Sequence, residues 1–509
     1  MAGSFGTEAA RAALDSGKPA LIWRRQVADT ETPVSAALKL MEEGRGDFLL
    51  ESVEGGETRG RHSLIGLAPD LLFRADGRQA AINRDWLNDQ QNFTPEDDDS
   101  LTALRRLVED CRMQVPEELP GALACLVGYF GYETIGLVEK LPRAPQSELD
   151  LPDMLFVRPT VILIFDRLAD ELFLVAPVWP ETAGNAPAKI AAAEERLDEV
   201  ARNLSQAVRP EMGELSRSTA AIPTEISFTP KLAPGKYAEM VLRAKDYIEA
   251  GDIFQVVLAQ RFTTPFTLPP IELYRALRRI NPSPFLFFLD LPGFALTGSS
   301  PEILVRARDG EVTIRPIAGT RPRGRNAAED KANRESLLAD PKERAEHLML
   351  LDLGRNDVGR VATAHSVEVT DSYTVEFYSH VMHIVSNVVG QLAPDKDAID
   401  ALFAGFPAGT VSGAPKVRAC QIIAELEPET RGAYAGGVGY FSPDGSMDSC
   451  IVLRTGIVKD GMLHVQAGAG IVADSNPAYE QAECEAKAGA LLAAAKEAVN
   501  RSRDVGFGQ

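Results

Sequence analysis

The sequence predicts a fold of the α/β class, of the α+β type, in which helices cover large antiparallel sheets. Three observations favour this class. Segments rich in β-branched and aromatic residues follow one another closely after residue 284, without the alternation of strand and helix that is typical of a doubly wound fold. Asp-Gly pairs, which are typical of tight hairpins, separate several of them. The chain ends in a segment of high helix propensity, residues 477–500, which should be a long helix packed on a sheet.

The size and composition of the chain indicate a globular protein. Its 509 residues, 45% hydrophobic and 25% charged, can form one large core or two to three ordinary ones. The formal net charge of -20 argues against a protein that binds nucleic acid or adheres to an anionic membrane, because either partner would be repelled over most of the surface. A small anion can still bind in a locally positive pocket.

The cysteines and the N-terminus predict where the protein resides. The five cysteines stand far apart, without a CxxC pair and in an odd number, which fits a reducing compartment better than a disulfide framework. We therefore expect a cytoplasmic protein. Residues 1–17 lack the apolar core of a signal peptide, and no segment approaches the roughly 18 apolar residues of a membrane helix.

The N-terminal half reads as mixed α and β. Residues 157–166 and 171–179 are β-rich runs, and apolar residues then recur at helical spacing up to Leu204. Pro, Ser and Thr interrupt residues 203–235, which predicts a linker or a long surface crossing. We expect two regions, 1–225 and 226–509, that pack as one intertwined unit.

The C-terminal half should begin with a helix that stops near Gly251. Short strands are expected over residues 285–290, 294–300, 302–310 and 311–320, with a hairpin at Asp309-Gly310. Residues 436–445, 447–461 and 462–472 should form three strands of an antiparallel meander, with turns at Asp444-Gly445 and Asp460-Gly461. The last helix has Asn476 as its N-cap and Pro477 in its first position.

Two predicted helices each carry a pair of glutamates three residues apart. These are Glu343 with Glu346, and Glu480 with Glu483, and the spacing puts each pair on one helix face. Such pairs are most often solvated surface. Glu346 borders the apolar run HLMLLDL, however, and Lys487 follows Glu483 by four residues. If the two pairs face each other, they form an oxygen-rich site suited to Mg²⁺.

Glycine-rich segments indicate an anion site rather than a nucleotide site. They lie at residues 316–324, 409–416, 436–439 and 467–470, with Thr, Ser, Arg and Lys interleaved. One such segment is usually only a turn, but several together suggest backbone N–H groups that approach an anion. None matches the phosphate loop or the dinucleotide fingerprint, so nucleotide cofactors are not expected.

Seven segments of the C-terminal half resemble the signature blocks of the chorismate-utilising enzymes, a family that includes anthranilate, aminodeoxychorismate, isochorismate and salicylate synthases. The segments are PIAGTRPRG, EHLMLLDLGRNDVGRVA, VMHIVS, GTVSGAPKVRA, GGVGYF, DSCIVLRT and QAGAGIV, in family order. Residues 49–66 also resemble the start of the amino-transferring members, so the resemblance covers most of the chain. It implies an anthranilate-synthase-like sandwich of large antiparallel sheets with the active site in a cleft.

The resemblance implies a metal site and a substrate pocket. Glu346 and Glu483 would hold Mg²⁺ directly, and Glu343 and Glu480 would bind through its waters, so that the metal fixes the ring carboxylate of chorismate. Lys487 would add a positive charge. The enolpyruvyl end would be held by further residues, since Arg can bind a carboxylate bidentately: Arg454, Tyr434 and the backbone of Gly468, Ala469 and Gly470.

Two residues match the family's catalytic groups. Glu302, in the sequence SSPE, matches the general acid that protonates the leaving ring hydroxyl. His383 matches the histidine that acts when pyruvate is eliminated, although without the motif a histidine here would more often be a satisfied core residue. Thr320 and Thr410 would form the polar wall of the site.

Two further positions separate the reactions within the family. Members that add water resemble one another in a lysine where this chain has Gln255, so the resemblance assigns Gln255 to substrate binding and favours ammonia as the nucleophile. Aminodeoxychorismate synthases commonly have a nucleophilic lysine in PIKGT, and this chain has Ala318 there, which cannot form a covalent adduct. The expected activity is therefore Mg²⁺-dependent amination of chorismate, followed by pyruvate elimination to anthranilate, the first step of tryptophan synthesis.

Three alternatives stay open. Some aminodeoxychorismate synthases, component I, also lack that lysine. An aminodeoxyisochorismate synthase would stop at the aminated intermediate that still carries pyruvate. A non-catalytic subunit that senses an amino acid would be a different class, but it has no need of the glutamates, Glu302, His383 and Lys487.

Ammonia should come from a second protein. The family takes it from a glutamine amidotransferase with a cysteine in a Gly-x-Cys-x-Gly turn, and no cysteine of this chain stands in such a turn. A separate small glutaminase subunit is implied, and with it a hetero-oligomer.

The resemblance also implies a regulatory pocket for tryptophan as a feedback inhibitor. It would combine residues 50–52 with residues 281–286. Glu51 could help to accept the ammonium of the amino acid, and Ser52, Pro284, Phe285 and Leu286 could form the wall for its indole. Without the resemblance, the first segment would be the end of an ordinary strand and the second a turn.

Overall fold

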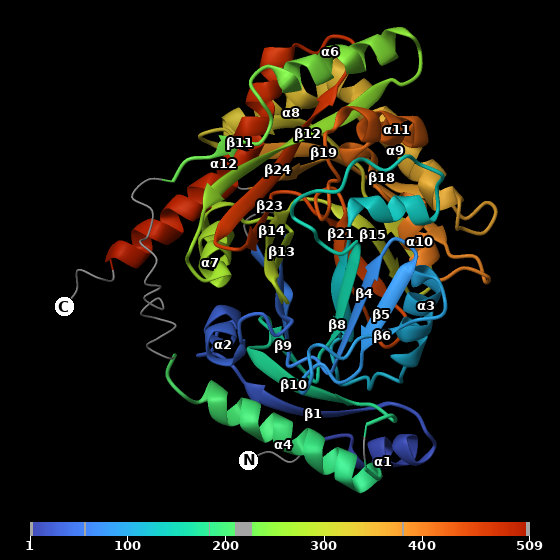
Figure 1. The fold of residues 1–509 in the computed structure, drawn as a ribbon, viewed down its shortest axis with the longest axis vertical. Coiled ribbons are helices and arrows are strands. Elements are labelled where there is room, and N and C mark those ends of the chain that lie inside the picture. The colour runs from blue at the N-terminus through green and yellow to red at the C-terminus, as the bar shows by residue number, and fades with distance from the viewer. Residues whose placement is uncertain (1–3, 55–57, 183, 209–225, 379–380, 505–509) are drawn as a thin grey trace.

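The computed structural model of the 509-residue chain describes residues 4–54, 58–182, 184–208, 226–378 and 381–504. Two twelve-stranded sheets, antiparallel throughout, form its framework, and helices lie outside them (Figure 1). This arrangement confirms the predicted fold class. Most of the predicted linker, residues 209–225, lies outside the described residues.

The first sheet joins strands from both ends of the chain. At its N-terminal edge it is covered by α1 (Thr7–Asp15), α2 (Pro33–Leu40) and α4 (Ala186–Leu204), and at the other end by α6 (Lys236–Glu249), α7 (Pro270–Ile280) and α12 (Pro477–Asp504). Its strand order is β1 (Ala20–Val27), β10 (Glu171–Val178), β9 (Val161–Asp166), β3 (Thr58–Leu67), β2 (Asp47–Glu54), β13 (Phe285–Leu291), β14 (Phe294–Ser300), β23 (Thr455–Lys459), β24 (Met462–Ile471), β12 (Gln255–Pro265) and β11 (Thr229–Pro230), with β20 (Gly413–Ala414) also on β12.

The second sheet is likewise shared by both halves. Its helices are α3 (Ser100–Asp110), α8 (Ala327–Ala339), α9 (Pro341–Gly359) and α10 (Ala398–Gly405). Helix α11 (Lys416–Leu426) and the 3-10 helix η2 (Gly409–Val411) instead contact β12 and β20 of the first sheet, and a further 3-10 helix is η1 (Tyr132–Leu137). Its strand order is β17 (Ile317–Pro322), β19 (Val381–Gln391), β16 (Glu311–Ile314), β15 (Ile303–Arg308), β22 (Met447–Ile451), β21 (Gly437–Phe441), β7 (Leu126–Phe130), β8 (Met154–Arg158), β4 (Leu71–Asp76), β5 (Gln79–Asn83) and β6 (Thr94–Pro95), with β18 (Glu368–Phe377) also on β19.

Local signals placed the turns and the last helix correctly. Asp309 and Gly310 have φ of 52° and 76°, and Asp460 and Gly461 have φ of 50° and 74°, so both pairs turn in the left-handed region that tight hairpins need. At α12, the side chain of Asn476 accepts hydrogen bonds from the backbone N–H groups of Ala478 and Tyr479. This is the predicted N-cap.

The expected three-stranded meander over residues 436–472 is wrong. β21 and β22 form a hairpin in the second sheet, whereas β23 and β24 form one in the first. The chain crosses between the sheets at Val452, Leu453 and Arg454, and Arg454 has a φ of 47°. Likewise, residues 157–166 and 311–320 are each two strands, with a proline at or beside the break, because proline has no N–H for a sheet ladder.

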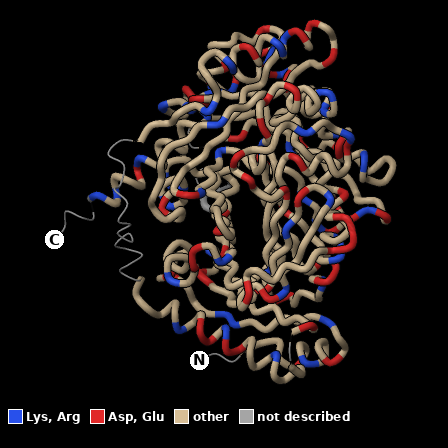
Figure 2. Tube along the Cα trace, in the orientation of Figure 1, with Lys and Arg blue, Asp and Glu red and all other residues tan. Residues whose placement is uncertain are grey.

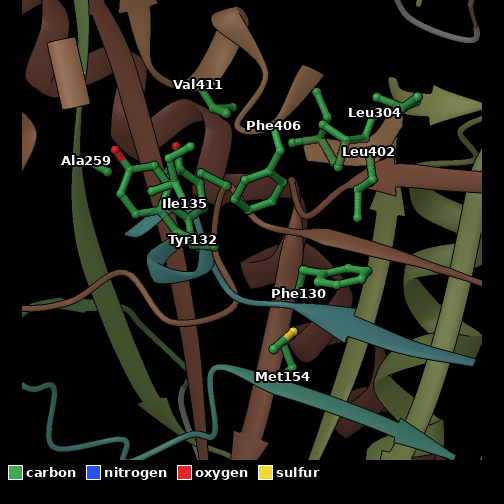
Figure 3. Packing of buried hydrophobic residues seen from close by; sticks show 14 of the residues in the cluster. Phe130, Tyr132, Ile135, Met154, Ala259, Leu304, Leu402, Phe406 and Val411 are labelled. Carbon is green, nitrogen blue, oxygen red and sulfur yellow. The ribbon is translucent and has the colours of Figure 1, made fainter. Parts of the chain in front are cut away.

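Aromatic side chains from both halves of the chain form the main core (Figure 3). Phe130 packs edge-on against Phe156 and Phe403, with ring centroids 4.9 and 5.7 Å apart. Phe403 in turn packs against Phe406. Burying one such side chain contributes about 1.5–3 kcal/mol, so this cluster ties the N-terminal strands to α10.

The net negative charge is spread over the molecule, and Lys and Arg alternate with Asp and Glu along the trace (Figure 2). Within the described residues, no helix is both long enough and apolar enough to pass through a membrane.

Candidate active site

A cavity of about 280 Å³ lies where the two sheets and helices α9 and α12 meet. Eleven residues that the sequence analysis proposed line it. They are Gln255, Glu302, Thr320, Glu346, His383, Thr410, Tyr434, Arg454, Gly468, Glu483 and Lys487. Ala318 lines it too, so the position that distinguishes reactions within the resembled family faces the same space.

Glu302 is a buried acid between β14 and β15. Glu302 is 7% exposed. The hydroxyl of Thr410 donates to its carboxyl group and lies 3.1 Å from each carboxyl oxygen. Burial raises the pKa of Glu302 to about 8, and the Thr410 hydrogen bond offsets part of that effect. The carboxyl is therefore protonated near neutral pH and can donate a proton into the cavity.

His383 on β19 is held in one tautomer. Its Nδ1 lies 2.9 Å from the carbonyl oxygen of Gly319 and 3.1 Å from the hydroxyl of Thr320. A carbonyl can only accept, so Nδ1 carries the proton and Nε2 is left to accept one. Burial, and then the nearby Arg454 charge, lower the pKa of His383. The ring therefore stays neutral, so that Nε2 can accept a proton.

Arg454 is a partly buried cation at the crossing between the sheets. Burial lowers its pKa, and the phenol of Tyr378 counteracts part of this effect. Among the described residues, no carboxylate forms an ion pair with Arg454. A partly buried guanidinium that faces a cavity without a counter-ion is suited to a ligand carboxylate. Tyr434 lies in the same wall, and a Cβ at Gly468 would come within 2.8 Å of its hydroxyl, so glycine fits there.

Glu346 on α9 and Glu483 on α12 both line the cavity, within electrostatic reach of each other. Burial raises the pKa of Glu346, and the charges of Glu343 and Glu483 raise it further. Lys487 Nζ lies 2.7 Å from Glu483 and 2.9 Å from the carbonyl oxygen of Gly468. The mutual repulsion of the carboxylates therefore favours a cation between them.

Four residues that were predicted for the site do not line the cavity. Glu343 accepts a hydrogen bond from Arg321 at 3.0 Å, and Glu480 is buried in the first turn of α12. Ala469 is completely buried in the core because side chains alternate along β24, and a Cβ at Gly470 would meet the Gln255 amide at 2.5 Å. In the described parts of the chain, no group of three or more His, Cys, Asp or Glu side chains is close enough to hold a metal ion.

The sequence analysis missed much of the cavity wall. Leu350 follows Glu346 by one helical turn, and Val257 follows Gln255 by two residues on one strand, so periodicity could have found both. The other missed residues lie inside the quoted motifs, close to residues that were proposed, so the motifs themselves could have indicated them: Pro301, Ile317, Gly319, Val411, Leu453, Gln466 and Ala467.

A second cavity, of about 310 Å³, contains most of the predicted regulatory residues. Glu51, Ser52, Phe285 and Leu286 line it, and Pro284 is not among its lining residues. Ser52 and Phe285 are direct cross-strand partners on β2 and β13.

Glu51 is already occupied by protein groups. Its carboxylate accepts hydrogen bonds from Tyr274, Arg278 and Arg167, and these contacts lower its pKa against the opposing effect of burial. Asp448, which also lines the cavity, has Oδ2 bonded to Arg306, while its buried Oδ1 is without a hydrogen-bond partner among the described residues. Among the described residues, Asp448 therefore keeps one carboxylate oxygen without a hydrogen-bond partner, whereas both oxygens of Glu51 accept hydrogen bonds.

Comparison with known proteins gives an independent view of the chain. A family model described as chorismate binding enzyme matches residues 47–493. The chain is 50% identical over 495 residues to anthranilate synthase component 1 of Cereibacter sphaeroides, covering 97% of this chain and 98% of the relative. It is 47% identical over 472 residues to anthranilate synthase component 1 of Thermus thermophilus, covering 93% and 97%.

Solved structures agree with these relatives. The crystal structure of anthranilate synthase component I from Streptococcus pneumoniae TIGR4 is similar, with a TM-score of 0.75, 36% identity, and coverage of 92% of this chain and 99% of that one. The menaquinone-specific isochorismate synthase from Escherichia coli, 19% identical with a TM-score of 0.68, shares the fold and covers 95% and 99%. The segment matched by the family model contains every residue that lines the two cavities.

Proposed function

Because the chain belongs to the chorismate-binding enzyme family, alongside the anthranilate synthase component 1 proteins, we propose that it aminates chorismate with ammonia in a Mg²⁺-dependent reaction and then eliminates pyruvate to give anthranilate. One observation carries this proposal. Three groups line the same cavity: Glu302 as a protonated acid, His383 as a neutral base, and the partly buried guanidinium of Arg454, which has no ion pair among the described residues.

In the first step, Glu302 acts as the general acid. Ammonia adds to the ring while the bond between a ring carbon and its hydroxyl breaks, and the proton of Glu302 leaves with that hydroxyl as water. The nitrogen that has added gives up a proton, so the step consumes one ammonia and releases one water. Arg454 binds the enolpyruvyl carboxylate throughout, which keeps the ring in place between Glu302 and His383.

In the second step, His383 acts as the base. Nε2 accepts the proton from the ring carbon that bears the nitrogen, and the electrons of that bond complete the aromatic ring as the bond to the enolpyruvyl oxygen breaks. The released enolpyruvate takes up a proton and becomes pyruvate. Ala318 offers no amine that could trap the ring covalently, which favours free ammonia as the nucleophile.

The carboxylates of the cavity fit a magnesium ion. Mg²⁺ is usually held by one or two protein carboxylates together with substrate and water, and Glu346 and Glu483 supply that number. When bound there, Mg²⁺ would neutralise and fix the ring carboxylate of chorismate. Glu343 and Glu480 stand about one turn away on the same helices and would bind through waters of the ion.

The source of ammonia is proposed to be a separate glutamine amidotransferase subunit in a hetero-oligomer. All five cysteines of this chain are buried, so none offers an exposed thiol for glutamine hydrolysis. The name component 1, which the relatives bear, also implies a second component.

The purified chain should therefore convert chorismate to anthranilate with ammonium and Mg²⁺, but not with glutamine. Mass and fluorescence identify the product and separate it from the para isomer and from an intermediate that retains pyruvate. Adding the amidotransferase subunit should restore the use of glutamine. Glutamine-dependent turnover by the chain alone, or a different product, would contradict the proposal.

We further propose that tryptophan binds in the second cavity and inhibits the enzyme. Phe285 and Leu286 offer an apolar wall for an indole. Asp448 forms ion pairs with Arg306 and Arg308 in the lining of the same cavity, so that charged groups of both signs are present for a zwitterion. Glu51 has a structural role in this proposal, because its contacts with Tyr274, Arg278 and Arg167 stabilise the wall of the cavity.

Ser52→Phe should abolish inhibition by tryptophan and leave the ammonium-dependent rate near that of the wild type. The larger ring would lie beside Phe285, its cross-strand partner, and fill the space for the indole. The measurement is a tryptophan titration of the ammonium-dependent assay, with Val27→Phe as a control at a site 73% exposed. A Ser52→Phe enzyme as sensitive as the wild type would place the inhibitor elsewhere.

A further inference from the structure

Tyr378 packs against the imidazole of His383 from behind the cavity. The two rings lie edge to face, with centroids 5.3 Å apart and planes at 65°. Tyr378 is only 7% exposed, and its backbone N–H donates to the carbonyl oxygen of Val381, so it sits at the hairpin that leads into β19. It does not itself line the cavity.

The hydroxyl of Tyr378 is tied to a charged pair. It donates to Glu376 Oε2 at 3.0 Å, and Glu376 also forms an ion pair with Arg315. The same phenol lies within the electrostatic reach of Glu302 and Arg454. Of the three groups to which the proposed function assigns the chemistry, the ring of Tyr378 contacts His383 directly and influences Glu302 and Arg454 only through charge.

Apart from this ring contact, the hydrogen bonds of the His383 imidazole to described residues involve Nδ1 alone. Its Nδ1 hydrogen bond to Gly319 fixes the tautomer but leaves the ring free to tilt about that bond. The edge-to-face contact with Tyr378 restricts this tilt and aims Nε2 at the substrate. Such aiming matters because a misplacement of about 1 Å can cost up to roughly 100-fold in rate.

We infer that Tyr378 is a positioning residue for the elimination step, and that its ring, through His383, sets how much of the aminated intermediate is carried on to the aromatic product. This inference rests on the proposed function. Amination depends on Glu302 and the metal side of the cavity, so it should be largely indifferent to Tyr378.

A product-ratio assay tests this directly. Tyr378→Leu, which removes the ring, should raise the ratio of aminated intermediate to anthranilate about tenfold at an unchanged KM for chorismate. Tyr378→Phe keeps the ring and should stay within about threefold of wild type. His383→Ala should raise the ratio most, and Tyr378→Leu added to it should raise it no further, because both act through one side chain.

The chain contains a matched control. Tyr373 on β18 packs in the same way against His347, with centroids 4.8 Å apart and planes at 61°, and neither residue lines the cavity. Tyr373→Leu therefore removes an equivalent contact and should leave the product ratio unchanged. Equal effects of Tyr373→Leu and Tyr378→Leu, or loss of both steps together in Tyr378→Leu, would overturn the inference. An unchanged ratio in His383→Ala would instead refute the role of His383 in the proposed function.

Discussion

Glu302→Gln should lower kcat for chorismate turnover by about 100-fold or more, because an amide cannot give a proton to the leaving hydroxyl. The buried site makes the loss severe, since the other acids among the described residues that line the cavity are Glu346 and Glu483, which are assigned to the metal. KM for chorismate should change little, as Gln fills the same volume and can still accept from Thr410. Steady-state kinetics with ammonium measure both constants.

The pH dependence identifies the same group. Glu302 must be protonated to act, and its pKa is raised to about 8, so at a fixed concentration of free ammonia kcat should fall as pH rises through that value. Thr410→Val removes the hydrogen bond that lowers this pKa and should move the fall to higher pH. A Glu302→Gln enzyme with near wild-type kcat, or an unmoved fall in Thr410→Val, would exclude Glu302 as the acid.

The second large effect is expected at Glu346 and Glu483, the two glutamates that line the cavity. Glu346→Gln or Glu483→Gln should each lower the rate by roughly 100-fold or more, equivalent to about 3 kcal/mol of lost stabilisation of charge. Exhaustive chelation of the wild type should have the same result, reversed by added Mg²⁺. Each variant should also bind Mg²⁺ more weakly in a titration, while its circular dichroism stays that of the wild type.

A neutral control lies on the same helix. Glu485 is exposed on α12, two residues after Glu483, and Glu485→Gln makes the same change of charge on the outer face. It should keep full activity and Mg²⁺ affinity. Full activity of the chelated wild type, or equal losses in Glu483→Gln and Glu485→Gln, would rule out a metal site at these carboxylates.

The fold was predictable where the signal is local. The hairpins at Asp309-Gly310 and Asp460-Gly461 and the cap at Asn476 each depend on a few adjacent residues, so the sequence alone reveals them. The crossing between sheets at residues 452–454 was not predictable. Val452 and Leu453 continue the apolar run of β22, and only the competing pairing partners of β22 and β23 break it.

In the candidate site, too, some residues could be predicted from the sequence and others could not. Residues to which the resemblance assigns a role were found, because it names them position by position. The partners of Glu51 were not, since Arg167, Tyr274 and Arg278 lie 116 to 227 residues away and meet it only in the folded chain. Tyr378 was missed for a related reason, because it contacts His383 but does not itself line the cavity.

The crossing at residues 452–454 constrains how this gene can vary in length. β22 and β23 are locked into different sheets, and side chains alternate with a period of two, so one inserted residue would either turn Arg454 away from the cavity or shift a whole strand by one register. Insertions are far better tolerated at the exposed hairpins, where only a turn has to change. Deletions and insertions should therefore accumulate around Asp444-Gly445, and the five residues from Cys450 to Arg454, which reach from one cavity to the other, should keep their spacing.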